Sequence, residues 1–271
     1  MIREKNVDSG SVQPALQQAN CYVQPGCQLY NEDCVETMQR IETGSVDLML
    51  TDPPYGTTQN DWDNKPFLAK IWAEWERILK PNGIWVFTAA EPFASELVVS
   101  RAVFFKYDMI WEKDRASGHL NANKMPLRAH EQILVFYRKP GTYNPQKSFG
   151  HKPANKNGQR KKETTNYGKF EHINGGGNTD RMPRSVIYEE VVNSQHEPIH
   201  PTQKPLDLMR YLVRTYSNEN DLVFDGYSGS GTTAAACIKE KRRFIGAELS
   251  KEYFDKSVER LELLRSKPEL F

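Results

Sequence analysis

Short apolar runs and longer amphipathic segments follow one another along most of the chain. Runs rich in β-branched and aromatic residues predict strands at residues 27–31, 46–51, 84–88, 104–111 and 132–137. Apolar positions that recur every three or four residues predict helices after Asp33 and at residues 66–80 and 91–103. Because strands and helices alternate, we expect an α/β fold with a largely parallel sheet covered by helices on both faces.

The same alternation returns near the C-terminus after a long interruption. Helices are predicted at residues 205–216, 232–241 and 250–264, with strands at 221–225 and 243–247. The interruption lacks a long periodic run, and residues 141–187 hold nine Lys or Arg against three Asp or Glu, a local net charge of +6 (9 − 3). Residues 1–26 are polar and predict an N-terminal arm. We therefore divide the chain into residues 1–26, 27–140, 141–198 and 199–271.

The composition is typical of a globular protein and argues against several classes. Of 271 residues, 38% are hydrophobic and 26% charged, and the longest apolar runs are too short to cross a bilayer. The N-terminus lacks an apolar signal-peptide core, so we expect a cytoplasmic protein. A formal net charge of +1 means that any nucleic-acid binding must come from a local patch. The four cysteines form no Cys-x-x-Cys pair, which favours reduced thiols and no metal site.

A rigid polar loop is predicted directly after the strand at residues 46–51. It reads Asp52, Pro53, Pro54, Tyr55, and two successive prolines fix the backbone and remove two amide donors. The Asp52 carboxylate and the Pro53 carbonyl can both accept hydrogen bonds, and Tyr55 offers a flat face for stacking. An aromatic amino group supplies two N–H donors, so this loop suits a base that carries one. The alternative is a proline-stiffened turn with a capping aspartate.

A glycine-rich loop follows the strand at residues 221–225, where the sequence from Asp225 reads Asp-Gly-Tyr-Ser-Gly-Ser-Gly-Thr-Thr. Gly229 and Gly231 allow a tight turn and a close approach to a ligand, and the helix that follows favours an anion. Glu248 ends the next predicted strand, where a carboxylate can accept hydrogen bonds from ribose hydroxyls. Taken alone, the loop could be a purely structural corner. Because ligands bind at the carboxyl ends of strands in such sheets, we expect both loops to share one site.

Three motifs together resemble the β group of amino-methylating DNA methyltransferases. They are Asp-Pro-Pro-Tyr at residues 52–55, His-Pro-Thr-Gln-Lys-Pro at 200–205 and Ser-Gly-Ser-Gly-Thr-Thr at 228–233, in that order. The resemblance covers residues 27–140, as a catalytic half, and residues 198–265, as a cofactor-binding half. It implies a Rossmann-like sheet of seven strands, S-adenosylmethionine as methyl donor and double-stranded DNA as partner, in a bacterial or phage-encoded enzyme. The chain departs from the family pattern at Gly226 and Tyr227, where Pro and Phe are usual.

The resemblance also assigns roles to residues of the cofactor-binding half and to Asp33. It implies that Thr202 and Gln203 hold the methionine carboxylate and that Asp33 bonds the cofactor adenine, although Asp33 can equally be a helix cap. The residues implied to surround the cofactor are Asp33, Thr202, Gln203, Lys204, Asp225, Tyr227, Gly229, Ser230, Gly231, Thr232, Thr233 and Glu248.

The activity expected from these motifs is transfer of a methyl group to adenine N6. The target base would leave the stack, lie against Tyr55 and donate its amino protons to Asp52 and the Pro53 carbonyl. Cytosine N4 presents nearly the same donors and stays an alternative, as does a non-catalytic DNA-binding subunit of the same fold. Members of the family often pair, so a homodimer is possible.

The basic interruption at residues 141–198 is the candidate region for reading DNA, together with the segment at 114–121 near the pocket. Lysine and arginine side chains would contact phosphates and fix the position of the protein on the duplex. The alternative is a solvated insertion without a binding role. The candidate DNA-binding residues are Arg115, His119, Lys147, Lys152, Lys156, Arg160, Lys161, Lys162 and Lys169.

Overall fold

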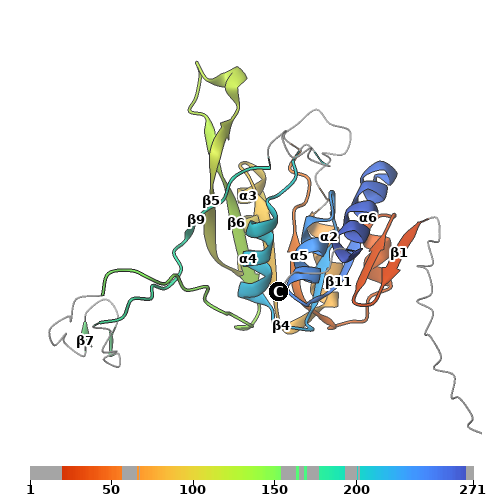
Figure 1. Ribbon diagram of the computed structural model, residues 1–271, viewed down its shortest axis with the longest axis horizontal. Helices are drawn as coiled ribbons and strands as arrows, with labels where there is room; N and C mark the ends of the chain where they lie inside the picture. The colour runs from red at the N-terminus through yellow and green to blue at the C-terminus, as the bar shows by residue number, and fades with distance from the viewer. Residues whose placement is uncertain are drawn as a thin grey trace, which may run out of the picture.

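The computed structural model describes residues 20–56, 66, 68–153, 163–164, 168–169, 177–192, 200 and 202–266. Their main feature is one mixed sheet of nine strands (Figure 1). From edge to edge the strands are β1 (Cys21–Gln24), β2 (Cys27–Tyr30), β11 (Arg243–Ala247), β10 (Leu222–Asp225), β3 (Val46–Thr51), β4 (Leu79–Ala89), β6 (Arg128–Tyr137), β5 (Phe105–Ser117) and β9 (Val186–Tyr188).

The centre of the sheet is parallel and its edges are mixed. Strands β2, β11, β10, β3 and β4 run parallel to one another. Strand β1 pairs antiparallel with β2, and β6 pairs antiparallel with both β4 and β5. The predicted α/β class with a mostly parallel sheet is thus confirmed, although the main sheet of the described residues has nine strands where the family resemblance implied seven.

The two additional strands come from segments whose local pattern is weak. Strand β1 lies within the expected polar arm of residues 1–26, of which residues 1–19 are outside the described residues. Strand β9 lies within the expected irregular insertion and adds to β5 in parallel. Both are edge strands of three or four residues, and their apolar residues are too few to produce a readable period.

Helices cover both faces of the sheet, as the alternation of elements predicts. Helices α1 (Cys34–Gln39), α2 (Leu68–Ile78) and α3 (Phe93–Ser100) pack on one face, in a core that contains Trp72, Trp75 and Trp85. Helices α4 (Leu206–Tyr216), α5 (Thr232–Lys239) and α6 (Lys251–Ser266) pack on the other face. Helices α2 and α4 each bury one apolar stripe, which explains their amphipathic sequences, whereas residues 232–237 of α5 are all buried.

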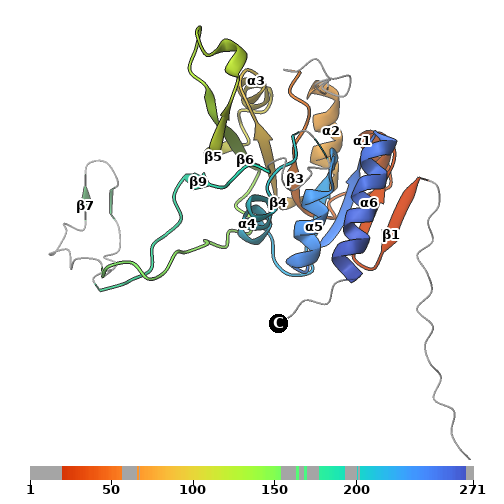
Figure 2. The same cartoon turned by 45° about the horizontal axis from the view of Figure 1, so that its top comes forward.

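Two parts of the molecule extend away from this layered body (Figures 1 and 2). One is the hairpin of β5 and β6, whose tip includes the short helix η1 (His119–Asn121). The segment 114–121, expected as a loop, is thus partly strand, because β5 continues to Ser117. The other is the basic insertion, in which β7 (Glu163–Thr164) pairs with β8 (Gly168–Lys169). No described helix is long and apolar enough to span a membrane.

Candidate active site

The loops after β3 and β10 meet because these two strands are parallel neighbours in the sheet. Val223 pairs with Leu48, so both strands deliver their following loops to the same edge. The Thr51 hydroxyl donates a hydrogen bond of 2.7 Å to Asp225 Oδ1, which joins the last residues of the two strands directly. Two segments far apart in the sequence therefore form one site, as the sequence predicts.

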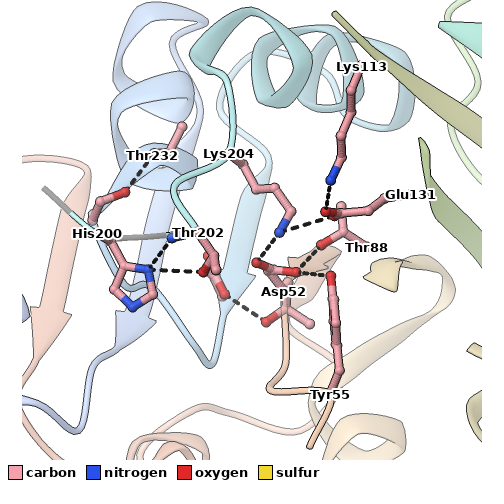
Figure 3. Close-up of polar contacts among 12 residues, drawn as sticks. Asp52, Tyr55, Thr88, Lys113, Glu131, His200, Thr202, Lys204 and Thr232 are labelled. Atoms are coloured by element: carbon pink, nitrogen blue, oxygen red, sulfur yellow. Dashed lines mark hydrogen bonds and ion pairs between the residues drawn. The ribbon is translucent and has the colours of Figure 1, made fainter. Parts of the chain in front are cut away.

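Asp52 stands at the centre of a short-range hydrogen-bond network (Figure 3). Its Oδ1 accepts hydrogen bonds from the hydroxyls of Tyr55 and Thr88, each at 2.5 Å. Its Oδ2 accepts one of 2.5 Å from Lys204 Nζ. Three donors from three different segments thus fix the orientation of the carboxylate, whose one remaining lone pair, on Oδ2, is available to a further donor.

A buried charge cluster extends from Asp52 into the sheet. Lys204 Nζ also lies 3.3 Å from Glu131 Oε2, and Glu131 Oε1 accepts a 2.5 Å hydrogen bond from Lys113. Burial lowers the pKa of Lys204, but the Asp52 and Glu131 carboxylates raise it above its ordinary value. Burial raises the pKa of Glu131, but Lys204 and Lys113 outweigh it and lower that pKa. Lys204 and Glu131 are therefore both charged at neutral pH.

Tyr55 lies beside this cluster as a neutral phenol. Burial raises the pKa of its hydroxyl well above the ordinary value, and the nearby Asp52 carboxylate adds to the effect. Phe93 stacks on the ring at 5.7 Å between centroids with an interplanar angle of 20°. The Tyr55 side chain also lines the large cavity described below. It is thus a supported aromatic surface at the edge of that cavity.

The glycine-rich loop turns at Gly229, where φ is +50°, and passes close to His200. A Cβ atom at Gly229 would lie 3.9 Å from His200 Cδ2, so this loop and the segment that begins at His200 are in contact. The Gly229 amide donates a 2.7 Å hydrogen bond to Glu248 Oε2, and the Ser250 amide donates one of 2.8 Å to Oε1. Burial raises the pKa of Glu248. This carboxylate is held rigidly at the end of β11, as predicted.

Asp33 caps helix α1, since its carboxylate accepts a 2.7 Å hydrogen bond from the Val35 amide. The residue also faces the cavity, so the cap does not exclude the predicted contact with a ligand. Thr202 is held by His200, whose Nδ1 lies 3.1 Å from the Thr202 hydroxyl. Gln203 lines the same cavity.

Most of these groups border one cavity of about 1310 Å³, large enough for a nucleoside cofactor together with a second planar ligand. Its lining includes most of the residues predicted from the motifs, namely Asp33, Asp52, Pro53, Pro54, Tyr55, Thr202, Gln203, Lys204, Asp225, Tyr227, Gly229, Ser230, Thr232, Thr233 and Glu248. Gly231 instead forms the N-cap of helix α5 behind the loop.

The structure gives one predicted residue a further contact and adds other residues to the site. Lys204, expected beside a cofactor, lines the cavity and has its ammonium on Asp52 and Glu131. Thr88, Lys113 and Glu131 were not predicted as site residues, since each lies within a strand that carries no recognisable motif. A charged residue next to the apolar run at 132–137 was the only signal for Glu131.

The predicted DNA-binding residues are only partly described. Arg115 and His119 lie on the exposed hairpin, where Arg115 Nε is 3.5 Å from Asp114 Oδ2. Lys147 pairs with Asp180 at 2.8 Å, and Lys152 is exposed; neither lines the cavity. The remaining candidates lie outside the described residues, or outside the described side chains for Lys169: Lys156, Arg160, Lys161, Lys162 and Lys169. No group of three or more metal-ligating side chains occurs in the part of the chain that the structure describes.

The cavity fits a cationic nucleoside such as S-adenosylmethionine at its glycine-loop end. Glu248 and Asp33 are acceptors for hydroxyl and amino donors, and the turn at Gly229 exposes backbone without a side chain. The Asp52 end carries acceptors and an aromatic ring, which suit a planar amino-bearing base. A family model described as DNA methylase (N6_N4_Mtase) matches residues 46–259, which include both loops. The chain belongs to this DNA methylase family.

Known proteins resemble this methylase over most of its length. The DNA adenine methyltransferase YhdJ of Escherichia coli (strain K12) is 29% identical over 249 residues, which cover 85% of this chain and 81% of that protein. The type II methyltransferase M.BglII of Bacillus subtilis is 28% identical over 255 residues, which cover 84% of this chain and 66% of that protein. The crystal structure of the M1.HpyAVI–SAM complex matches with a TM-score of 0.59 and 26% identity, covering 87% of this chain and 98% of that one.

Proposed function

We propose that this methylase transfers a methyl group from S-adenosylmethionine to adenine N6 at a specific site in double-stranded DNA. The observation that carries the proposal is the position of Asp52. Its carboxylate is oriented by three donors and lies in the same cavity as the glycine-rich loop. The likeness to YhdJ, a DNA adenine methyltransferase, and to M.BglII, a type II methyltransferase, supports the same activity.

The cofactor supplies a methyl group on a positively charged sulfur. Asp33 and residues of the C-terminal half would hold it: Glu248 would accept from the ribose hydroxyls, Asp33 from the adenine amino group, and Thr202 and Gln203 would donate to the methionine carboxylate. The Gly229 turn would let the backbone approach the ligand closely. These contacts would hold the cofactor in the cavity that Asp52 also lines.

The target adenine would leave the duplex stack and lie against Tyr55. Its amino protons point to Asp52 and the Pro53 carbonyl, which turns the nitrogen lone pair toward the methyl group. Holding both reactants in this geometry supplies much of the rate. The Asp52 carboxylate also stabilises the positive charge that develops on nitrogen.

The alternative substrate is cytosine N4, since the family includes both amino targets and the same acceptors fit either base. An aspartate at the first position of the loop favours adenine within the family. A restriction partner is consistent with the type II relative, and a homodimer stays a prediction.

The decisive experiment incubates the protein with labelled S-adenosylmethionine and unmethylated genomic DNA. Nucleoside analysis is expected to find the label in N6-methyladenine, and sequencing locates the site. Label in N4-methylcytosine would select the alternative substrate. If the protein neither binds the cofactor nor transfers the label to DNA, the chain is a non-catalytic DNA-binding subunit.

The basic insertion is proposed to contribute phosphate contacts. If about six phosphates are neutralised, the affinity for duplex DNA falls on the order of a thousandfold between 50 and 200 mM salt. Fluorescence anisotropy with a labelled duplex measures this slope. An affinity that is independent of salt would contradict the proposed contacts.

A further inference from the structure

The tip of the β5–β6 hairpin carries a leucine that the fold leaves entirely in water. The relative exposure of Leu120 is 101%, which is unusual for a large apolar side chain in an ordered turn. The tip is ordered by its own hydrogen bonds, since the Asn121 amide donates to the Gly118 carbonyl at 2.9 Å and the Met125 amide to the Asn121 carbonyl at 3.0 Å. Gly118 turns the chain with φ +91°. Leu120 therefore lies on an ordered, hydrogen-bonded turn.

This tip stands at the mouth of the catalytic cavity. Gly118 and Asn121, on either side of Leu120 in the sequence, both line the cavity, and so do Met125 in the tip and Arg128 at the start of β6. Figures 1 and 2 show the hairpin rising beyond the helices that cover the sheet. A long molecule that presents one of its groups to Asp52 must therefore pass close to the tip.

The charge of the hairpin tip fits a polyanion. Residues 115–130 include Arg115, Lys124 and Arg128, together with two histidines, and contain no Asp or Glu. An exposed apolar side chain on a segment that carries cations and no carboxylate is the combination with which proteins wedge open a base stack while holding the phosphates.

From this geometry we propose that Leu120 is a wedge that enters the duplex and fills the space left by the target base. The inference rests on the proposed methyltransferase function and names the residue that promotes rotation of the base. The basic side chains of the hairpin contact the flanking phosphates, and Leu120 leaves water for the apolar interior of the stack. Leu120 acts on the paired state of the DNA and does not touch the reacting atoms, so it is a positioning residue.

The test compares two duplexes that contain the methylated site identified by sequencing. One is fully paired, and the other has an abasic site opposite the target base, which lowers the cost of extrusion. Leu120→Ala is expected to methylate the paired duplex about tenfold more slowly than wild type. It should match wild type on the abasic duplex, because no base pair must be broken there.

Two further variants separate a wedge from a general loss. Leu120→Met keeps an apolar side chain of similar length and should retain activity on both duplexes. Leu263→Ala removes an equally apolar, 55% exposed leucine from α6, away from the hairpin, and should behave as wild type. Thermal unfolding of Leu120→Ala should equal that of wild type, since the side chain packs against nothing.

If the rate of Leu120→Ala relative to wild type is the same on both duplexes, whether normal or reduced, the proposed wedge is overturned. Failure of the wild-type protein to bind S-adenosylmethionine or to methylate either duplex would overturn the proposed function itself. The two failures are thus distinguishable in one experiment.

Discussion

Asp52 is positioned by residues that no single motif contains. Tyr55 belongs to its own loop, but Thr88 comes from β4 and Lys204 from the segment before α4. Glu131 holds Lys204 from the far side and balances its charge. The carboxylate therefore keeps a fixed orientation and an effective negative charge toward the cavity.

Replacing Asp52 with alanine tests the central residue. Asp52→Ala removes the acceptor for the amino group, and methyl transfer should fall at least about a hundredfold. Cofactor affinity, measured by calorimetry, should remain near that of wild type, because Lys204 keeps Glu131 as its partner. Near-normal turnover would contradict the assigned role of Asp52.

Glu131→Gln tests the charge balance. Without the second carboxylate, Lys204 neutralises Asp52 alone, so kcat should fall by about tenfold to a hundredfold while cofactor affinity is retained. Glu240→Gln is the matched control, since Glu240 also bridges two cations, Arg210 and Arg214, but does not line the cavity. Steady-state kinetics should leave the control unchanged. Equal kcat in both variants would show that Glu131 has no electrostatic role.

At the scale of elements, the parallel pairing of β3 with β10 brings the two loops together. The glycine-rich loop in turn depends on a glycine in the left-handed backbone region. Gly229 adopts φ +50° beside His200, and Gly44 adopts φ +66° with no atom within 4 Å of a hypothetical Cβ. The two glycines share a backbone requirement and differ in their surroundings. This difference separates the conformational effect of the glycine from its role at the cavity.

Alanine at either position should therefore cost about 1 kcal/mol of folding free energy. Only Gly229→Ala should also weaken binding of S-adenosylmethionine, because its methyl group enters the cavity lining. Denaturant unfolding and calorimetry measure the two effects. Equal cofactor affinities of Gly229→Ala and Gly44→Ala would remove the glycine-rich loop from the cofactor site.

For the whole molecule, joining two loops at one sheet edge buries a carboxylate. Burial raises the pKa of Asp225 to about 6, although hydrogen bonds from Thr233, Thr51 and the Tyr227 amide oppose the shift. Asp225 therefore binds its proton more tightly in the folded state than in the unfolded state, where an aspartate titrates near its ordinary pKa of 3.8. The contribution to stability is fully present below about pH 4 and is lost as the pH rises to about 6.

The variant Asp225→Asn cannot ionise and should escape this loss. Relative to wild type, its free energy of unfolding should rise by up to about 3 kcal/mol between pH 4 and pH 7, since the shift is about two pKa units. Urea unfolding at several pH values gives the difference. Parallel pH profiles for the two proteins would contradict the buried, raised carboxyl.

Local sequence was sufficient to predict the elements that carry the motifs. The strands before Asp52 and Asp225 and the amphipathic helices were predicted because burial of one face imposes a period on the residues themselves. Proline and glycine likewise restrict the backbone at their own positions, which is why the rigid loop and the tight turn could be located. Edge strands β1 and β9 carry too few residues for such a period.

The sequence by itself determined the α/β class, the order of the loops and the chemistry that each loop offers. Only the tertiary structure decided that Lys204 and Glu131 join Asp52, that β9 completes the sheet and that the long hairpin stands over the cavity. The physical reason is that a residue's period and backbone limits are local, whereas its neighbours depend on strand order and direction. Glu131 lies near Asp52, on the other side of Lys204, because β6 pairs antiparallel with β4. No pattern within either strand predicts that pairing.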